Sequence, residues 1–341
     1  MGLYEILDKI NRFIYNEFRM NITKSMTISG LAMKIYTSNF MNHKIYKVRG
    51  KIHDDIRIAF YGGRVDVFNP KGERLYQYDV NSLYPHSMLN DMPIGKPRFT
   101  NNPNLKDYFG FVFAEIKSPE YMFIPTLPHR DNNKMFCPLG SWKGWYFSEE
   151  LKQAEEFGYE IKVLYGYQFN RGKEVFDNYV YTCYYHKKNS TGVLREIYKL
   201  LLNSLFGRMG MNEVGDKISM VNDNELDSLL TSHIIESIFD LDDNRFLVRY
   251  KNMPDRNLCE LSEQDFNTEL LKSDYSKRTI TQSVPIAAAI TAYSRMYINK
   301  LMHLEGYKYY YTDTDSLITD KPLPSEYVGN ELGPEGLTRG G

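Results

Sequence analysis

Two aspartates one residue apart, Asp313 and Asp315, end a run of tyrosines in the segment YYYTDTDS at residues 309–316. Aromatic and β-branched residues on both sides favour extended chain, so the segment is predicted to form a hairpin with these aspartates at its turn. Two carboxylates held at a tight turn repel each other, and a bound divalent cation relieves that repulsion. Asp-x-Asp alone is more often an Asx-rich surface turn, so the choice depends on the rest of the chain.

Composition sets broad limits on the class of protein. With 341 residues, 42% hydrophobic and 25% charged, the chain is typical of a folded protein and can build two or three lobes. The formal net charge of −1 gives no global signal for nucleic acid, so any polyanion site has to be a local patch. Three widely spaced cysteines argue against a disulfide framework or a zinc site and favour a reducing compartment. Residues 1–20 resemble neither a secretory signal nor a transit peptide, and no apolar run is long enough to span a bilayer.

The periodicity of apolar residues predicts a mixture of helices and strands, and the predicted fold class is α+β. Helices are expected at residues 3–18, 27–36, 84–89, 148–157, 174–185, 191–206 and 286–304, and strands at 74–78 and 111–116. Residues 44–68 read as strand-like segments that the sequence YGGR at 61–64 interrupts, where two glycines permit a turn or a close approach of backbone. Residues 212–274 read as a polar, irregular segment, and the chain after Asp320 reads as a loosely ordered tail.

The helix expected at 191–206 carries a basic and polar stripe. Arg195, Lys199 and Asn203 recur every four residues, and apolar residues fill the opposite face. Such a stripe is usually a solvated surface. Residues 187–208, however, contain five basic side chains against one acid, Glu196, and this local excess suits a ligand that carries phosphates.

A third carboxylate, Asp79, follows the strand expected at 74–78. If that strand and the tyrosine strand are neighbours in one sheet, Asp79, Asp313 and Asp315 converge. Carboxylates that hold two hard divalent ions, with substrate phosphates completing the coordination, are the arrangement for in-line phosphoryl transfer. The basic helix would then hold a triphosphate from the opposite side.

Three segments resemble motifs of the family B DNA polymerases and occur in that family's order. DVNSLYP at 79–85 resembles motif A, KLLLNSLFG at 199–207 resembles the fingers motif, and YTDTDS at 311–316 resembles motif C. YGGR at 61–64 is similar to the family's Tyr-x-Gly-Gly element, and TAYSR at 291–295 resembles its Thr-x-x-Gly/Ala-Arg primer-binding element. Two insertions, near 124–172 and 212–275, resemble the protein-primed branch, and the likeness extends to polymerases of fungal mitochondrial linear plasmids.

The resemblance implies a role for each matched position. It makes Asp79 and Asp315 the catalytic carboxylates that bind metal together with Val80, while Asp313 supports them. The residues that it places at the incoming nucleotide are Val80, Ser82, Leu83, Tyr84, Arg195, Lys199, Asn203 and Phe206. Within that set Tyr84 would reject a 2′-hydroxyl and Lys199 would neutralise the triphosphate. The residues that it places at template or primer are Tyr61, Gly62, Gly63, Thr291 and Arg295.

The same resemblance implies cofactors and partners. A DNA-directed DNA polymerase of this branch uses two Mg²⁺ ions, for which Mn²⁺ can substitute, together with dNTPs and a primer–template. A terminal priming protein is a further expected partner, and no membrane is expected. Replication of a linear plasmid or organellar element, in the mitochondrion, is the implied setting. Phe206 stands where the family usually has Tyr, and Ser294 where it has Gly or Ala.

The expected organisation is a polymerase palm, an antiparallel sheet with helices, joined to helical fingers and two insertions. The predicted divisions are a helical and strand lead-in at 1–60, palm with motif A at 61–123, a first insertion similar to terminal-protein region 1 at 124–172, fingers at 173–211, a second insertion similar to terminal-protein region 2 at 212–275, palm with motif C at 276–320 and a truncated tail at 321–341. The exonuclease and thumb domains of the family are expected to be missing from this chain.

Two other functions compete with polymerase activity. A catalytically inactive polymerase relic, or a fragment that binds DNA or a terminal protein without turnover, would carry the same motifs. A reverse transcriptase or RNA polymerase palm is disfavoured, because reverse transcriptases carry adjacent aspartates whereas Thr314 separates Asp313 from Asp315. Tyr84 in the sugar-gate position also favours deoxynucleotides.

Overall fold

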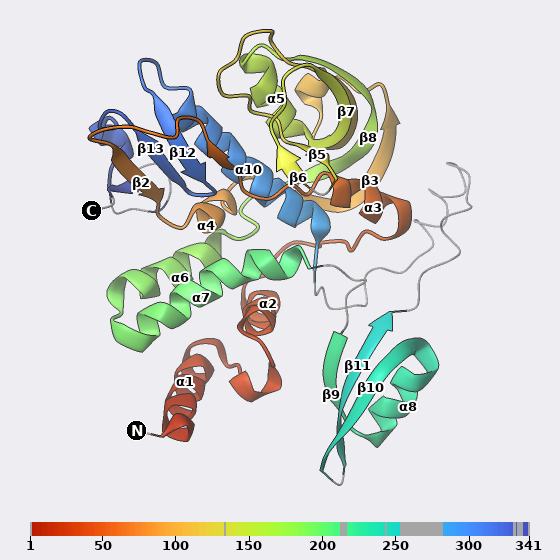
Figure 1. Ribbon diagram of the computed structural model, residues 1–341. Coiled ribbons are helices and arrows are strands. Elements are labelled where there is room, and N and C mark those ends of the chain that lie inside the picture. The colour runs from red at the N-terminus through yellow and green to blue at the C-terminus, as the bar shows by residue number, and fades with distance from the viewer. Residues whose placement is uncertain are drawn as a thin grey trace. The chain divides into compact units, whose positions relative to one another are not determined.

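The computed structural model describes residues 2–132, 134–211, 217–242, 244–252, 282–329, 332 and 337–339. These residues fall into two compact units, one within Met1–Gly210 and Ser273–Gly341 and the other within Met211–Lys272. Helices and strands are mixed in both units, and the paired strands of every described sheet are antiparallel (Figure 1). The predicted α+β class is therefore confirmed.

The first unit contains a five-stranded sheet. Its strand order is β1 (Val65–Val67), β12 (Tyr309–Asp313), β13 (Ser316–Thr319), β2 (Tyr76–Val80) and β14 (Leu337–Arg339). Strands β2 and β13 alternate buried residues with more exposed ones, and Tyr78, Val80 and Leu317 face the core. The hairpin predicted around Asp313 and Asp315 is present, and it pairs directly with the strand that leads to Asp79.

The longest helix, α10 (Val284–Met302), is buried along most of its length, as its alanines and other apolar residues predict. Its C-terminal half packs against the five-stranded sheet through Ile298, Leu301 and Met302. Its other contacts include α4 (Leu83–Ser87), α5 (Ser148–Glu156) and α7 (Gly192–Met209). Figure 1 shows α10 running between the five-stranded sheet and a second sheet of the same unit.

That second sheet has four strands and a core rich in aromatic rings. Its strand order is β3 (Met92–Asn101), β8 (Glu160–Gly172), β4 (Gly110–Lys117) and β7 (Ser141–Phe147). A short hairpin of β5 (His129–Asp131) and β6 (Lys134–Phe136) lies between β4 and β7 in sequence. The boundary predicted at residue 124 divides this sheet, because β3 and β4 precede it and both pair with β8, which follows it.

Four further helices of the first unit lie close to their predicted positions. They are α1 (Leu3–Phe18), α2 (Ile28–Asn39), α6 (Asp177–Asn189) and α7, with short 3-10 turns at η1 (Ile22–Lys24), η2 (Leu105–Asp107) and η5 (Ser325–Tyr327). Helices α6 and α7 lie side by side, and α2 packs on α7 (Figure 1). Lys187 and Lys188, at the start of the basic segment 187–208, lie in the last turn of α6.

One predicted strand region contains a helix. Residues 44–68 were expected to be strand-like, but α3 (Gly50–Ile58) occupies part of them. Ile52 and Ile56, one helical turn apart, are buried on one side of α3, and Asp55 is buried beside them. The prediction was wrong because polar residues fill the positions between the two isoleucines and hide the helical period.

The second unit also differs from its prediction. Where an irregular segment was expected, β9 (Lys217–Val221), α8 (Asp223–Ser232), β10 (His233–Asp242) and β11 (Arg245–Asn252) form a three-stranded sheet with one helix, in the order β10-β11-β9. Asn222 begins α8 in a capping box with Glu225, a local start signal that the sequence contains. The rest of the predicted 212–275 insertion lies outside the described residues.

The predicted loose tail contributes structure as well. Strand β14 pairs with β2, opposing Leu337 to Val80, and the side chain of Leu337 is fully buried. Its apolar contact was not visible in a segment rich in Gly and Pro. Cys137 and Cys183 are free thiols, and Cys259 lies outside the described residues. No helix in the described part of the chain is long and apolar enough to cross a membrane.

Candidate active site

The pairing of β13 with β2 brings Asp79 and Asp315 together. Ser316 lies opposite Asp79 in the register, and the Val80 amide donates a 2.7 Å hydrogen bond to the Asp315 carbonyl oxygen. Asp313 ends β12 and pairs with Val65 on the other side. The three carboxylates that sequence analysis expected to converge therefore lie at the same end of one sheet, where Asp79 and Asp313 are exposed and Asp315 is partly buried.

The turn between Asp313 and Asp315 is conformationally costly. Thr314 has φ of +54°, in the left-handed region that β-branched residues rarely adopt. Its amide donates to the Arg64 carbonyl at 2.8 Å, its hydroxyl donates to Asp313 Oδ1 at 3.1 Å, and the Asp315 amide donates to the Asp313 carbonyl at 2.6 Å. These bonds hold the turn in place.

Gly63 lies directly against this turn. A Cβ atom at Gly63 would stand 2.5 Å from Thr314 Oγ1 and 2.7 Å from its Cγ2, closer than non-bonded atoms approach. A Cβ at Gly62 would meet nothing within 4 Å. Close approach, one of the two explanations that the sequence left open for the glycine pair, therefore applies to Gly63.

The two adjacent carboxyl groups resist ionisation. Burial, and next the neighbouring Asp79, raise the pKa of Asp315 to about 6. Burial also raises the pKa of Asp79, while Lys199 acts to lower it. A cation between the two groups would offset both the lost hydration and the mutual repulsion.

The donor set fits a hard divalent cation. Within the described residues, no group of three or more His, Cys, Asp or Glu side chains converges as a complete metal cage. Asp79 and Asp315 supply two carboxylates, and Mg²⁺ in proteins is commonly held by one or two carboxylates together with substrate phosphates and water. The predicted ligand role of Val80 stays a prediction; its amide is already bonded to Asp315.

Lys187, which was not among the residues predicted at the nucleotide, contacts the segment after Asp79 through Ser82. Ser82 has φ of +57° and precedes α4, whose first residue, Leu83, buries its side chain in the core. Lys187 Nζ donates to Ser82 Oγ at 3.0 Å. Burial lowers the pKa of Lys187, and repulsion from Arg195 and Lys199 lowers it further. The sequence signal for Lys187 was its place at the start of residues 187–208, where basic side chains outnumber acidic ones.

Two predicted nucleotide-site rings lie face to face. The rings of Tyr84 and Phe206 stack with centroids 4.3 Å apart and an interplanar angle of 16°. Burial raises the pKa of the Tyr84 hydroxyl; Arg295 acts to lower it, and Asp315 and Asp313 raise it. Tyr84 thus stacks on α7 and is close enough to Asp313 and Asp315 for their charges to affect its pKa.

The basic stripe of α7 has the predicted orientation. Arg195, Lys199 and Asn203 are exposed, while Tyr198 and Leu201 on the opposite face are buried. Lys199 is close enough to Asp79 to affect its pKa. The stripe therefore supplies positive charge on the side of the site that faces solvent.

Three of the residues predicted to contact DNA have buried side chains. Tyr61, Thr291 and Arg295 are at most 3% exposed, so these side chains lie in the core of the protein and do not present a surface to DNA. The Thr291 hydroxyl donates within its own helix, to the carbonyls of Ala287 and Ala288. Of the predicted DNA-binding set, Gly62 is exposed and Gly63 is partly exposed, which leaves their backbone as the accessible part.

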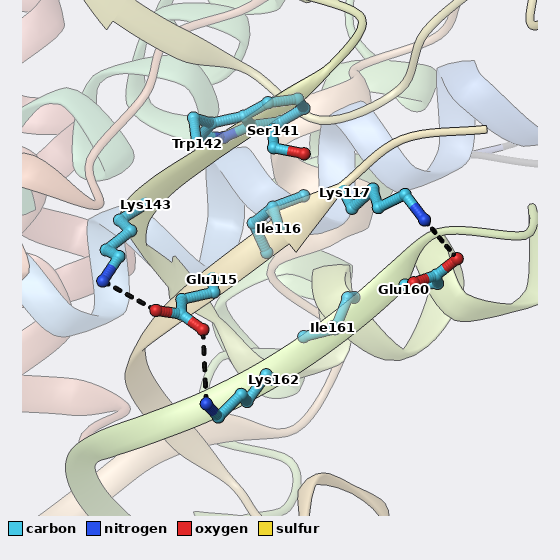
Figure 2. Close-up of a pocket in the computed structure, with 9 residues that line it drawn as sticks. All are labelled: Glu115, Ile116, Lys117, Ser141, Trp142, Lys143, Glu160, Ile161 and Lys162. Carbon is cyan, nitrogen blue, oxygen red and sulfur yellow. Dashed lines mark hydrogen bonds and ion pairs between the residues drawn. The ribbon is translucent and has the colours of Figure 1, made fainter. Parts of the chain in front are cut away.

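A pocket of about 610 Å³ lies away from these residues, on β4, β7 and β8 (Figure 2). Its charged side chains pair with one another. Lys143 and Lys162 both point to Glu115, at 2.6 and 3.5 Å, and Lys117 pairs with Glu160 at 2.9 Å. Each of these charged side chains has a partner of opposite charge, and three lysines against two glutamates leave a net charge of only +1. The pocket therefore offers little for a charged substrate, and the aspartate site remains the candidate for chemistry.

Comparison with known proteins agrees with this geometry. The family model for DNA polymerase type B, organellar and viral, matches residues 2–305. The chain belongs to this family. Over 98% of its length this type B polymerase chain is 37% identical to a probable DNA polymerase of Podospora anserina and 33% identical to one of Neurospora intermedia. It covers only 29% and 34% of those two relatives, so it spans about a third of their length. The predicted membership of family B and the likeness to fungal polymerases are confirmed.

Solved structures of Phi29 DNA polymerase share the fold of this type B polymerase chain. The complex with primer-template DNA and incoming nucleotide superposes with a TM-score of 0.63 at 20% identity, over 91% of this chain and 52% of that one. The complex with single-stranded DNA gives the same TM-score over 95% of this chain and 53% of that one. At this identity the likeness shows the fold alone.

Proposed function

We propose that this chain carries the nucleotidyl-transfer centre of a DNA-directed DNA polymerase, which joins a dNTP to a primer 3′-hydroxyl. The observation that carries the proposal is the β2–β13 register, which brings Asp79 and Asp315 together from distant parts of the sequence. The raised pKa values of both carboxyl groups mark a site that favours a cation. Family membership supports the same conclusion.

Two Mg²⁺ ions, or Mn²⁺ in their place, would supply activation of the attacking oxygen and stabilisation of charge on the leaving pyrophosphate. Asp79 and Asp315 would hold them, with Val80 as a further ligand through its carbonyl. Asp313, exposed at the end of β12, would support the turn and adjust its charge.

Three cations would receive the triphosphate. Burial lowers the pKa of Lys187, and repulsion from Arg195 and Lys199 lowers it further. A polyanion bound among them would remove that repulsion and form charge-assisted hydrogen bonds. Asn203, exposed one turn further along α7, would line the same nucleotide pocket, and the backbone at Ser82 and Leu83 would meet triphosphate oxygens.

Sugar selection would fall to Tyr84. Its ring is held from one side by the stack on Phe206, which itself packs edge-on against Phe60 at 6.5 Å. A ring fixed in this way can exclude a 2′-hydroxyl by contact. Phe206 supplies the stacking surface without the hydroxyl that Tyr would carry.

The biological setting that we propose is protein-primed replication of a linear plasmid or organellar element, with a terminal protein as partner, in the mitochondrion. The fungal relatives named as probable DNA polymerases support only the DNA-synthesis part of this proposal. The plasmid, the terminal protein and the mitochondrion rest on the sequence resemblance alone. The activity of those longer proteins is assigned to this chain only as part of the proposal.

Template-directed incorporation tests the function. A primer–template with one unpaired template base is incubated with the 341-residue chain, Mg²⁺ and each dNTP separately. Extension by the complementary dNTP alone supports polymerase activity. Binding of DNA without any Mg²⁺-dependent product would indicate instead an inactive relic or a binding fragment.

A further inference from the structure

A buried ion pair contacts the segment that supports the turn between Asp313 and Asp315. Arg295 of α10 and Glu150 of α5 are 3% and 2% exposed, and two hydrogen bonds of 2.7 and 2.8 Å join the guanidinium to the carboxylate. The remaining terminal nitrogen of Arg295 donates to the carbonyl oxygens of Tyr61 and Gly62, at 2.8 and 3.0 Å. The guanidinium therefore joins α5 to the backbone of the 61–62 segment.

The same segment continues directly into the support of the aspartate turn. The carbonyl of Arg64 accepts the Thr314 amide, and Gly63 has no room for a Cβ beside Thr314. Val65 then pairs with Asp313 in the sheet. Residues 61–65 are thus held by Arg295 at one end and contact the turn at the other.

Stability alone is a poor explanation of this pair. Two charges lose their hydration when buried, and apolar residues of similar volume often stabilise a core as well or better. Two adjacent backbone carbonyls and one carboxylate, by contrast, require a planar donor with several N–H groups, which only arginine provides.

We propose that Arg295 and Glu150 are positioning residues for nucleotidyl transfer. Glu150 orients the guanidinium, the guanidinium fixes the carbonyls of Tyr61 and Gly62, and the segment that follows fixes Thr314 between Asp313 and Asp315. Neither residue touches substrate or metal. This inference rests on the proposed function only for its effect on catalysis, because the effect on the turn is independent of it.

The first test follows the turn itself. Arg295→Lys keeps a buried positive charge beside Glu150 but lacks the planar fork, so hydrogen exchange in a peptide covering residues 309–318 should become about tenfold faster. The matched control is Asp55→Asn, which removes a buried carboxylate that accepts hydrogen bonds from Tyr167 at 2.7 Å and Lys51 at 3.0 Å. These hydrogen bonds of Asp55 do not involve residues 61–64. Exchange in the 309–318 peptide should therefore stay unchanged in this control.

The second test measures the metal site without catalysis. Mn²⁺ binding is followed by loss of the free-ion EPR signal, with Asp315→Asn protein as the blank. Supporting groups behind metal ligands typically affect metal affinity or activity 10–100-fold, so Arg295→Lys should weaken the Asp315-dependent Mn²⁺ binding about tenfold. Under single-nucleotide incorporation, kcat should fall about as much, while KM for dNTP should stay within about twofold.

A second variant guards against poor folding of the first. Glu150→Leu combined with Arg295→Met replaces the pair by apolar residues of similar size and should fold, while removing every bond to Tyr61 and Gly62. It should reproduce faster exchange and weaker Mn²⁺ binding.

Unchanged exchange and unchanged Mn²⁺ affinity in both folded variants would overturn the proposal. In the variant that combines Glu150→Leu with Arg295→Met, a fall of about one in the salt slope of DNA binding with the turn unaffected would also overturn it, since that result marks Arg295 as a phosphate contact. If the turn loosens while the parent protein shows neither Asp315-dependent Mn²⁺ binding nor incorporation, the positioning role stands and the proposed function fails.

Discussion

The amide of Val80 donates a 2.7 Å hydrogen bond to the carbonyl oxygen of Asp315. This hydrogen bond joins the end of β2 to the turn of the β12–β13 hairpin. Together with the β2–β13 register, it brings the carboxylate of Asp79 close to that of Asp315. Burial and this proximity raise the pKa of Asp315 to about 6. Asp79 and Asp315 therefore repel each other when both are ionised, at the place where the proposed chemistry needs a cation.

The first prediction concerns stability against pH. Because the pKa of Asp315 is raised in the folded state, the native protein binds more protons than the unfolded chain between about pH 4 and pH 6. Its free energy of unfolding should therefore fall as pH rises through this window. Asp315→Asn should stabilise the metal-free protein above pH 6, by about 1 kcal/mol once solvent screening is allowed for, and the gain should vanish below about pH 4. Urea unfolding in EDTA measures both; a gain that is independent of pH would contradict the assignment.

The second prediction concerns Gly63. Gly63→Ala should cost about 1–3 kcal/mol, because the added Cβ would overlap the stiff, β-branched side chain of Thr314. Gly62→Ala is the matched control, since a Cβ there meets nothing within 4 Å. Adding Thr314→Gly to Gly63→Ala should recover most of the loss, because it removes both the clash and the side chain from a left-handed position. Thermal unfolding of the four proteins decides the matter, and equal losses in the two alanine variants would refute the close approach.

The third prediction concerns Lys187. Lys187→Met should raise KM for dNTP about tenfold or more while kcat changes by less than about threefold, because a charge-assisted contact to the triphosphate is lost without moving the carboxylates. Lys173→Met, which removes an exposed lysine before α6, is the control and should leave KM unchanged. Steady-state incorporation over a range of dNTP concentrations gives both constants. An unaltered KM in Lys187→Met would remove this residue from the nucleotide site.

The fourth prediction concerns sugar selection. Tyr84→Val should improve incorporation of rNTP relative to dNTP by about 10–200-fold, the range expected when a side chain that excludes a small group is cut back. Tyr84→Phe keeps the ring stacked on Phe206 and should retain the selectivity. Competition between rNTP and dNTP at one template base provides the ratio. Equal selectivity in the valine and phenylalanine variants would exclude Tyr84 as the gate.

Strong local patterns made part of this structure predictable. The hairpin at Asp313 and Asp315 follows from β-forming residues around a turn, and α7 and α10 follow from their apolar periodicity. The nearness of Asp79 rested on the family resemblance, because nothing local to residue 79 states which strand lies beside it.

Other features depend on partners far away in sequence. The family resemblance placed Arg295 at template or primer, but its side chain is buried against Glu150, a carboxylate partner 145 positions earlier in the chain. Helix α3 buries only Ile52, Asp55 and Ile56, so its apolar period was lost among polar side chains. Strand β14 has three residues and gains its place from the edge of β2. Tertiary contacts decided each of these cases.

The central claim is that Asp79 and Asp315 form a metal-dependent nucleotidyl-transfer centre. Single-turnover incorporation of one complementary dNTP, with Mg²⁺ and then with EDTA, tests it in the parent chain, in Asp315→Asn and in the buried-carboxylate control Asp55→Asn. The account predicts Mg²⁺-dependent product from the parent and the control, and a loss of about 10³-fold or more in Asp315→Asn, as for removal of a group that acts directly on the reacting atoms. Product that forms in EDTA, or at an undiminished rate in Asp315→Asn, would contradict it.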